Sequence, residues 1–313
     1  MNSGRRKFLQ TLPLLTAFGS LQSAEATTKP LLKENSFYMA TNQYPWQTFY
    51  QREGRDWPGN PDACLKEVAD AGFQGYEPLV NNVEELTSLH PYLKKYNLEI
   101  RSLYVNSTLH KENESERNLQ NIIKIAEVAK KLNTKIFVTN PSPIQWGGTQ
   151  DKSDRELEIQ AGNLNTLGAA LKNLGITLAY HNHDIEMRKS AREFHHMLLA
   201  TEPKNVSLCL DSHWVYRGSG NSQIALFDII KLYGHRIVEL HLRQSSNGVW
   251  DEVFGLGDID YQKLAEVLQD LKVRPHLVME QCVEDQSPKT LKALPAHIQS
   301  FRNGRNVFVK LAE

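Results

Sequence analysis

The chain has 313 residues, of which 40% are hydrophobic and 23% charged, proportions that are ordinary for a globular protein. Lys and Arg together number 36, as do Asp and Glu, so the formal net charge is zero. This balance provides no long-range field for nucleic acid or an acidic membrane, and neither is expected as a partner. Cys64, Cys209 and Cys282 lie far apart without a CxxC pair, which favours small core residues over a disulfide framework.

The first 26 residues are typical of an export signal. Arg5, Arg6 and Lys7 precede an apolar stretch over residues 8–21, and Ala24-Glu25-Ala26 offers a site for a signal peptidase. The paired arginines resemble the twin-arginine export motif, and an ordinary secretory signal that carries two arginines is the alternative. The sequence therefore predicts a signal peptide over residues 1–26.

Removal of this signal would leave a polar linker, residues 27–35, ahead of the folded part. The signal contains three bases and one acid, so the processed chain would carry a slight net negative charge. No later apolar run reaches the roughly 18 residues that a membrane helix needs. We expect an exported, periplasmic protein without a membrane partner once the signal is gone.

Eight short apolar segments with turn residues around them predict β-strands. Most are apolar along their whole length, which is typical of strands buried on both faces of a parallel sheet. The predicted strands are Ser36–Thr41, Gln74–Glu77, Glu99–Val105, Lys135–Thr139, Thr177–His181, Val206–Asp211, Ile237–Leu242 and His276–Glu280.

Amphipathic segments alternate with these strands and predict helices. Arg155–Leu174, for example, places Ala161, Leu164, Leu167 and Leu171 on one stripe and stops before a glycine. The other predicted helices are Pro61–Ala71, Val83–Tyr96, Ser115–Leu132, Ser190–Ala200, Ser222–Tyr233, Asp260–Leu271 and Ser287–Arg302.

Eight β–α repeats predict a single α/β domain, a (β/α)8 TIM barrel over residues 36–310. A doubly wound sheet would show the same alternation of strands and helices, but a glycine-rich phosphate-binding loop would be expected after its first strand. The segment that follows here, Asn42-Gln-Tyr-Pro-Trp46, contains no glycine. No repeat, low-complexity tract or linker divides the domain.

Polar and metal-capable side chains gather where five of the predicted strands end. In a barrel of this kind the active site lies at the carboxyl ends of the strands. Burying such groups is costly unless they are paired or bound to a metal. Histidine with carboxylates suits a divalent ion such as Mn²⁺, Zn²⁺, Co²⁺ or Mg²⁺, and a set of satisfied core polar groups is the alternative. The residues are Glu77, His181, His183, Asp211, His213, Glu239, His241, Arg243 and Glu280.

Four short motifs follow one another along the chain: Asp211-Ser-His213, Glu239-Leu-His-Leu-Arg243, Gly255-Leu-Gly-Asp-Ile-Asp260 and Val278-Met-Glu280. In this order they resemble the sugar phosphate isomerase/epimerase family, whose fold is the xylose isomerase-like TIM barrel. The resemblance covers nearly the whole expected domain. It implies one divalent metal ion, held by His181, Asp211, His241 and Glu280. It also implies that His213 and Arg243 bind substrate and that Trp250 forms a sugar-stacking wall.

Position 181 departs from the family pattern, because the metal ligand expected there is a glutamate. Epimerases of the family move a proton next to a carbonyl between two metal-bound carboxylates. Here either Glu186 or Glu77 supplies the second acid, or Glu280 acts as the only carboxylate base. His183 and Glu186 are the further candidates for handling the proton, and Glu77 is also a candidate for binding substrate.

Three functions follow from this pattern. The first is a metal-dependent isomerase or epimerase acting on a neutral sugar, and the second is a lyase or hydratase acting on a 3-keto-glycoside, as in an exported subgroup that the sequence resembles. The third is a sugar-binding protein without catalysis. Similar barrels in abasic-site endonucleases act on DNA, which the charge and the export signal argue against. The resemblance also implies a possible homo-oligomer.

Several other residues are candidates for the pocket or for structural roles. Tyr44, Tyr104 and Asn106 follow predicted strands and are able to line a sugar pocket, as is Trp46. A Pro- and Gly-rich segment, Asn140–Gly148, stands after strand four where a lid would lie. The remaining histidines, His276 among them, have no partners nearby in the sequence and are expected to be structural.

Overall fold

The computed structural model describes residues 37–312 of the chain. The predicted signal peptide (1–26) and linker (27–35) lie outside the described residues. Within residues 37–312, no helix combines the length and the apolar character that crossing a bilayer requires.

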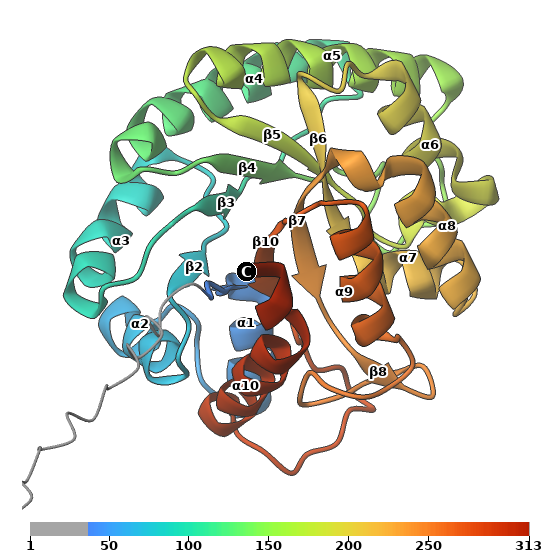
Figure 1. Cartoon of the computed structure of the whole chain (residues 1–313). Helices are drawn as coiled ribbons and strands as arrows, with labels where there is room; N and C mark the ends of the chain where they lie inside the picture. The colour runs from blue at the N-terminus through green and yellow to red at the C-terminus, as the bar shows by residue number, and fades with distance from the viewer. Residues whose placement is uncertain (1–36, 313) are drawn as a thin grey trace, which may run out of the picture. The chain divides into compact units, whose positions relative to one another are not determined.

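Eight parallel strands form one sheet that curls into a barrel, with the helices on its outer side (Figure 1). Their order around the barrel is β2-β1-β10-β7-β6-β5-β4-β3, so neighbours along the chain are neighbours in the sheet. The strands are β1 (Ala40–Asn42), β2 (Gly75–Glu77), β3 (Ser102–Tyr104), β4 (Ile136–Thr139), β5 (Thr177–His181), β6 (Val206–Asp211), β7 (Ile237–Leu242) and β10 (His276–Met279).

Strands β2 and β3 meet at the seam of the barrel, where no continuous ladder joins them. Isolated parallel bridges link Gly75 with Glu99 and Leu79 with Tyr104. Around the rest of the barrel each strand pairs with both neighbours. The prediction of a TIM barrel is therefore confirmed, and β5, β6 and β7 begin and end at the predicted residues.

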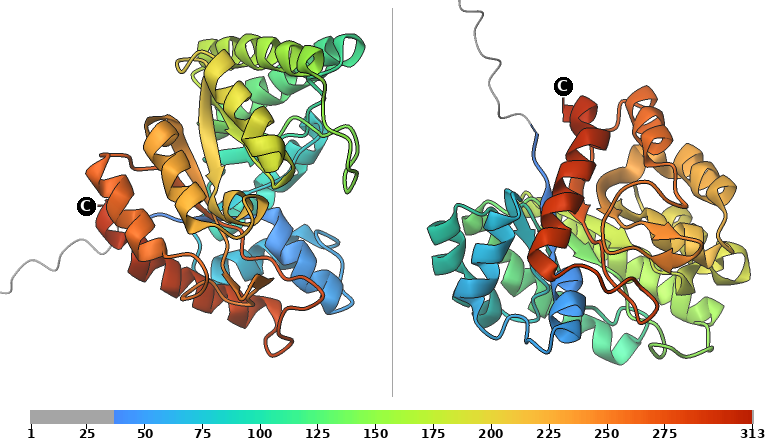
Figure 2. Two further views of the ribbon diagram at one scale, coloured as in Figure 1. Left: turned by 90° about the vertical axis from the view of Figure 1, so that its right-hand side faces the viewer. Right: turned by 90° about the horizontal axis from the view of Figure 1, so that it is seen from below.

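The helices cover the outside of the barrel, and α10 contacts α9, α2 and α1 (Figure 2). Seven of the eight predicted helices agree with the structure to within three residues at either end, and the three-residue shift belongs to α4, whose last turn continues as a 3₁₀ turn over Lys130–Leu132. The helices are α1 (Gln43–Arg52), α2 (Pro61–Asp70), α3 (Val83–Tyr96), α4 (Glu112–Ala129), α5 (Asp154–Asn173), α6 (Arg188–Ala200), α7 (Ser212–Gly218), α8 (Gln223–Tyr233), α9 (Tyr261–Asp270) and α10 (Ala293–Ala312).

Two helices were not predicted, and one prediction was wrong. Helices α1 and α7 lie directly after β1 and β6, where the sequence analysis placed no helix. The last helix begins at Ala293, not at Ser287, because the preceding segment is held as a loop. The buried carboxylate of Glu252 accepts hydrogen bonds from the backbone N–H groups of Thr290 and Leu291, and Arg52 donates to backbone carbonyls of the same segment.

Most apolar side chains pack between the barrel and its helices, in one large core. Inside the barrel the apolar cluster is small and consists of Val138, Ala179 and Cys209, with partly buried neighbours. All three cysteines are buried and free, as expected. Much of the barrel interior is therefore left to polar side chains, which surround the candidate site. A short hairpin, β8 (Ser245–Ser246) with β9 (Val249–Trp250), follows β7 beside it.

Candidate active site

Four potential metal ligands converge at the carboxyl ends of neighbouring strands. His181 ends β5, Asp211 ends β6, His241 lies in β7, and Glu280 follows β10. The ladder pairs Asp211 directly with His241. One ligand atom from each of the four residues lies within 4.8 Å of those of the other three, and all four side chains are buried. The structure thus brings together the four residues predicted to hold a metal.

Local hydrogen bonds aim these side chains. Asp211 Oδ1 accepts from the backbone N–H of Trp214 at 2.9 Å, which caps helix α7 and leaves Oδ2 available. The side chain of Asn182 clamps the same residue, since it accepts from the Asp211 N–H and donates to the Asp211 carbonyl, both at 3.1 Å. Asn140 donates to the His181 carbonyl at 2.9 Å. These two asparagines were not singled out from the sequence.

The ligand atoms themselves have few hydrogen-bond partners. Within the described part of the chain, His181 Nε2 and Asp211 Oδ2 are buried and make no hydrogen bond, whereas His241 Nδ1 and Glu280 Oε2 lie against each other. Leaving one such polar group unsatisfied costs about 1–3 kcal/mol. Two imidazole nitrogens and two carboxylate oxygens that converge on one point fit a bound divalent cation such as Mn²⁺, Co²⁺, Zn²⁺ or Mg²⁺. The residues present therefore fit the predicted metal.

A pair of buried carboxylates lies below His241. Its Nε2 is 3.2 Å from Glu77 Oε1 and 3.2 Å from Glu239 Oε1. Burial would raise the pKa of Glu77, but His241 holds it below its ordinary value, whereas burial and the Glu77 charge raise the pKa of Glu239 well above its own. Contacts of this kind orient a metal-binding histidine through its second nitrogen. Glu77, predicted to bind substrate, lines the cavity described below but has its carboxylate against His241.

Arg243 is fully buried beside the cluster. Its Nη2 donates to Glu280 Oε1 at 2.5 Å and lies 3.8 Å from Asp211 Oδ2. Burial would raise the pKa of Glu280, but Arg243 and then His241 hold it below its ordinary value, so the carboxylate is ionised. Arg243 does not line the cavity, although it was predicted to bind substrate.

Trp250 and His213 also lie away from the cavity. The ring of Trp250 is buried with its centroid 4.3 Å from the Arg243 guanidinium, so it packs on Arg243 and is not an open stacking wall. The ring of Trp214 lies 4.9 Å from the same group. His213 Nε2 is 3.0 Å from Ser245 Oγ, which in turn donates to Asp258 at 2.7 Å. The substrate contacts proposed for these two residues therefore have no support in this geometry.

His183 and Glu186 have different surroundings. His183 lines the cavity, with its ring centroid 4.8 Å from that of His181, and burial lowers its pKa to about 4. Glu186 is fully buried in a 3₁₀ turn and does not line the cavity. Its carboxylate accepts from the backbone N–H of His183 at 2.6 Å and from Asn140 at 3.1 Å, and burial raises its pKa to about 7.

A cavity of about 400 Å³ opens beside the ligand cluster. Its rim carries aromatic rings, with Trp146 57% and Tyr44 44% exposed. Trp146 belongs to the segment expected to act as a lid, whereas Trp46 is buried and stacks on His297. Trp214, Gln43, Gln47 and Asp184 were not predicted, because they lie on α1, on α7 and in the turn after β5. The lining residues are Asn42, Gln43, Tyr44, Gln47, Glu77, Leu79, Tyr104, Asn106, Trp146, His181, His183, Asp184, Trp214 and Glu280.

Comparison with known proteins places this geometry among sugar-processing barrels. The model of the xylose isomerase-like TIM barrel family matches residues 65–301. An inosose dehydratase from Mesomycoplasma hyopneumoniae is 30% identical over 259 residues, which is 74% of this chain and 84% of that protein. An inosose dehydratase from Clostridium perfringens is 25% identical over 248 residues, with coverage of 70% and 81%.

Solved structures share the fold at lower sequence identity. A sugar phosphate isomerase/epimerase from Parabacteroides distasonis superposes with a TM-score of 0.69 at 15% identity, covering 92% of this chain and 99% of that one. The 3-keto-D-glucoside 4-epimerase of E. coli gives 0.62 at 15% identity, with coverage of 86% and 98%. A barrel of the same type from Mycobacterium smegmatis, solved in complex with magnesium, gives 0.65 at 14% identity, with coverage of 88% and 98%.

Proposed function

The chain belongs to the xylose isomerase-like TIM barrel family, and from this premise we propose that it is a metal-dependent lyase acting on a neutral, polyhydroxylated keto compound. In the proposed reaction a proton is taken from the carbon next to the carbonyl group and passed to the oxygen of a substituent on the following carbon, which leaves as water or as an alcohol. The observation that carries the proposal is the convergence of four buried ligand atoms beside an open cavity.

His181, Asp211, His241 and Glu280 would hold the metal, which when bound would polarise the substrate carbonyl and stabilise the negative charge that develops on its oxygen. The protein's own groups fix this arrangement. Glu77 and Glu239 orient His241, and Arg243 keeps Glu280 ionised while balancing part of the buried negative charge. The enclosing rings of Trp214 and Trp250 shield Arg243 from water.

We propose His183 as the group that takes the proton, with Glu280 as the alternative. Both residues line the cavity. Oε1 of Glu280 is bound by Arg243, and Oε2 lies against His241 Nδ1, which leaves this carboxylate little freedom to accept a proton. The ring of His183 makes no hydrogen bond with residues 37–312, so a ring nitrogen is available. A positioned imidazole is a common general base.

The arrangement of acids favours elimination over epimerisation. Epimerisation needs a second group to return the proton on the opposite side of the carbon. Glu186 does not reach the cavity, and the carboxylate of Glu77 faces His241. One proton-transfer group beside a metal fits loss of water or of a glycosidic substituent. Epimerisation remains the second candidate, because His183 and Glu280 both line the cavity and are able to act as a pair.

The cavity indicates a substrate of modest size with one apolar face. Its volume of about 400 Å³ falls near the low end of small-molecule sites, which span about 300–1,000 Å³. Polar ligands form the floor, and Tyr44, Trp146 and Trp214 supply flat rings at the rim. Aromatic rings pack well on the apolar face of a sugar or on an attached group. We therefore propose an inosose-like ring or a 3-keto-glycoside as the substrate class.

Proton NMR in D₂O with the metal-loaded protein tests the reaction. Inosose and a 3-keto-D-glucoside serve as substrates, with Mn²⁺, Co²⁺, Zn²⁺ or Mg²⁺ added. Loss of water or release of the aglycone supports elimination, whereas deuterium entering a ring carbon with all bonds intact supports epimerisation. If neither occurs with any of the four metals, the proposal of an enzyme of this class fails.

Matched variants then separate the roles of the two candidate bases. His183→Gln should abolish turnover and keep the metal, because His183 is outside the four-ligand set. Glu280→Gln should lower the metal content as well as the activity. Metal content is read by elemental analysis after gel filtration. An active His183→Gln variant would transfer the role of the base to Glu280.

We also propose that the protein is exported to the periplasm by the twin-arginine route. The support is the sequence of residues 1–26, which lie outside the described residues. Replacing Arg5 and Arg6 by lysine in the full chain should keep the protein in the cytoplasm, as cell fractionation would show. Size-exclusion chromatography with light scattering tests the expected homo-oligomer, for which a single monomeric mass is the contrary result.

A further inference from the structure

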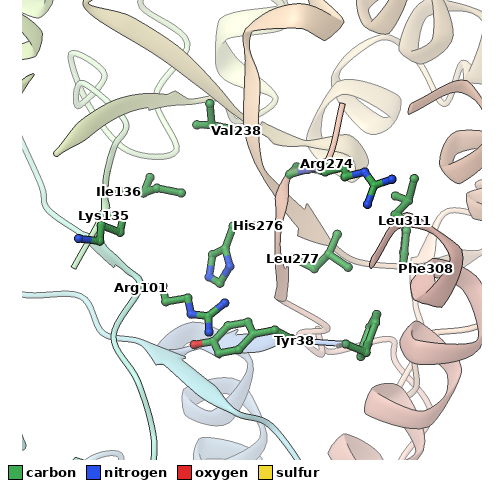
Figure 3. Close-up of a pocket in the computed structure, with 12 residues that line it drawn as sticks. Tyr38, Arg101, Lys135, Ile136, Val238, Arg274, His276, Leu277, Phe308 and Leu311 are labelled. Carbon is green, nitrogen blue, oxygen red and sulfur yellow. The ribbon is translucent and has the colours of Figure 1, made fainter. Parts of the chain in front are cut away.

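A second cavity lies at the opposite end of the barrel from the ligand cluster. Its volume is about 430 Å³, similar to that of the candidate active site. The residues around it come from the amino ends of the strands. Tyr38 precedes β1, Arg101 precedes β3, and His276 begins β10 (Figure 3). The amino end of a TIM barrel serves stability in most enzymes, so a polar cavity there calls for an explanation.

Three hydrogen-bonding groups meet in the middle of this cavity. Figure 3 shows Arg101, Tyr38 and His276 turned toward one another. The Arg101 guanidinium lies 3.5 Å from the centroid of the Tyr38 ring, and the rings of Tyr38 and His276 are 5.4 Å apart. The Tyr38 hydroxyl and His276 Nε2 are buried, and neither has a hydrogen-bond partner among the residues described.

All three groups are able to donate a hydrogen bond. Burial raises the pKa of Tyr38 above its ordinary value, so the hydroxyl keeps its proton, and burial lowers the pKa of His276 to about 4, so its ring is neutral with one N–H. Arg101 Nε donates to Glu99 at 2.6 Å, while its two terminal nitrogens make no hydrogen bond within residues 37–312. Each of the three groups thus has a donor, and Arg101 has only donors.

The charged side chains that line the cavity are all cationic. Lys135 and Arg274 lie at its edges, on either side of the central group in Figure 3, and neither forms an ion pair with a described residue. No acidic residue of the described chain lines the cavity; Glu99, the partner of Arg101, lies outside it. Exposed charges act over about 8–10 Å at physiological ionic strength, so both cations contribute to the potential in the cavity.

The rest of the lining is mostly apolar and comes from both the strands and the last helix. Phe308 and Leu277 are buried, and Arg274 runs beside Leu311 in Figure 3. A bare inorganic ion would leave this surface in contact with water, whereas an attached hydrocarbon group would cover it. The apolar members are Phe37, Ile136, Val238, Leu277, Phe308 and Leu311.

We propose that this cavity binds a small organic oxyanion, a phosphate or carboxylate joined to a short apolar group. Arg101 and the ring of His276 hold the charged head, and the apolar side chains hold the tail. Lys135 and Arg274 increase the rate of capture and make binding depend on salt. The site is separate from the metal cluster and does not depend on the reaction proposed there.

Calorimetric titration of the purified protein with three probes tests the site: inorganic phosphate, hexyl phosphate and hexanoate. Hexyl phosphate should bind more tightly than inorganic phosphate, and higher salt should weaken it. Comparison of hexyl phosphate with hexanoate shows whether the cavity prefers a phosphate or a carboxylate head group. The absence of a binding signal for all three probes at millimolar concentration would overturn the proposal.

Two variants and a matched control locate the binding. Arg101→Gln and His276→Phe should each weaken the binding of hexyl phosphate about tenfold, as expected for loss of one hydrogen bond to a charged group. Arg155→Gln is the control, since Arg155 also forms an exposed 2.6 Å ion pair with a glutamate but lies on α5. If hexyl phosphate binds all the variants and the wild type with equal affinity, it binds at a site other than this cavity.

Discussion

His183 and Glu186 stand three residues apart after strand β5, yet only one of them reaches the cavity. Glu186 is turned inward, where its carboxylate fixes the backbone of His183. Both residues were predicted to handle the proton. Within a strand, alternate side chains face the same side, so the sequence indicates which of them point inward. After β5 the chain enters a 3₁₀ turn, where this alternation no longer holds. The sequence therefore does not show which of the two side chains faces the cavity.

Replacement of Glu186 by Gln should leave turnover within a few-fold of the wild type and change the pH dependence of stability. Burial raises the pKa of Glu186 from 4.5 to about 7, so the folded wild type holds a proton that the unfolded chain has lost. Its free energy of unfolding therefore falls as the pH rises from 4.5 to 7. Above pH 7 the wild type has lost the contribution of this group to the free energy of unfolding, which amounts to at most about 3 kcal/mol. Glu186→Gln has a neutral side chain at every pH and keeps this contribution.

Urea unfolding at pH 5 and pH 8 measures this effect. The advantage of Glu186→Gln over the wild type should be larger at pH 8. A variant that folds and binds metal but has lost activity by a factor of a thousand would show instead that Glu186 takes part in the reaction.

Trp146→Ala should weaken substrate binding more than it slows the reaction. Trp146 is 57% exposed at the rim, with its ring centroid 5.1 Å from that of His183. Loss of one aromatic contact costs about 1 kcal/mol, so KM for a 3-keto-glucoside should rise about five- to tenfold. Trp57→Phe serves as a control, because Trp57 packs in the core away from the cavity. A purely kcat effect would contradict the assignment of Trp146 to binding.

At the scale of elements, all eight strands of the barrel were predicted, whereas two of its helices were not. β5, β6 and β7 are buried on both faces, and their continuous apolar runs mark both ends. Helix α7 has only seven residues, and its cap, Asp211, is also a predicted metal ligand, so the sequence offered no separate signal for it. Such short helices depend on packing against the barrel.

The same reasoning explains which parts of the site were predictable. The four ligands lie at fixed positions on strands, so barrel geometry alone brings them together. The roles of Arg243 and Trp250 depend on how the hairpin β8–β9 folds back, which a strand pattern does not specify. Glu239 was among the polar residues predicted at the strand ends, but its contact with Glu77 depends on the curvature of the barrel.

Two glycines of helix α5 should respond in opposite ways to alanine. A Cβ at Gly168 would lie 2.1 Å from the backbone oxygen of Asn205, so helix and β6 must move apart, whereas a Cβ at Gly162 meets nothing within 4 Å. We expect Gly168→Ala to destabilise the protein by about 1–3 kcal/mol and Gly162→Ala to stabilise it by about 0.5–1 kcal/mol. Urea unfolding measures both, and equal effects would contradict the close approach of α5 to the start of β6.

At the scale of the whole molecule, metal binding should couple to stability. An ion that binds only the folded state raises the free energy of unfolding, by about 2.7 kcal/mol at a concentration one hundred times its Kd. Chelation should therefore lower the Tm, and Mn²⁺, Co²⁺ or Zn²⁺ should restore it. Asp211→Asn should lose most of this response, and Asp258→Asn, outside the ligand set, should keep it. A Tm indifferent to chelation and to added metal would count against the site.

The seam between β2 and β3 has a mechanical consequence for the whole barrel. Only isolated bridges join these strands, so this is the place where the ring should open first when the native state fluctuates. β2 ends at Glu77, whose carboxylate lies against His241. Hydrogen–deuterium exchange should be faster at the seam amides of Tyr76, Val80 and Tyr104 than at β6. Each opening would also separate Glu77 from His241, one of the predicted metal ligands. The rate at which the barrel opens at this seam would therefore limit the rate at which a bound ion is released.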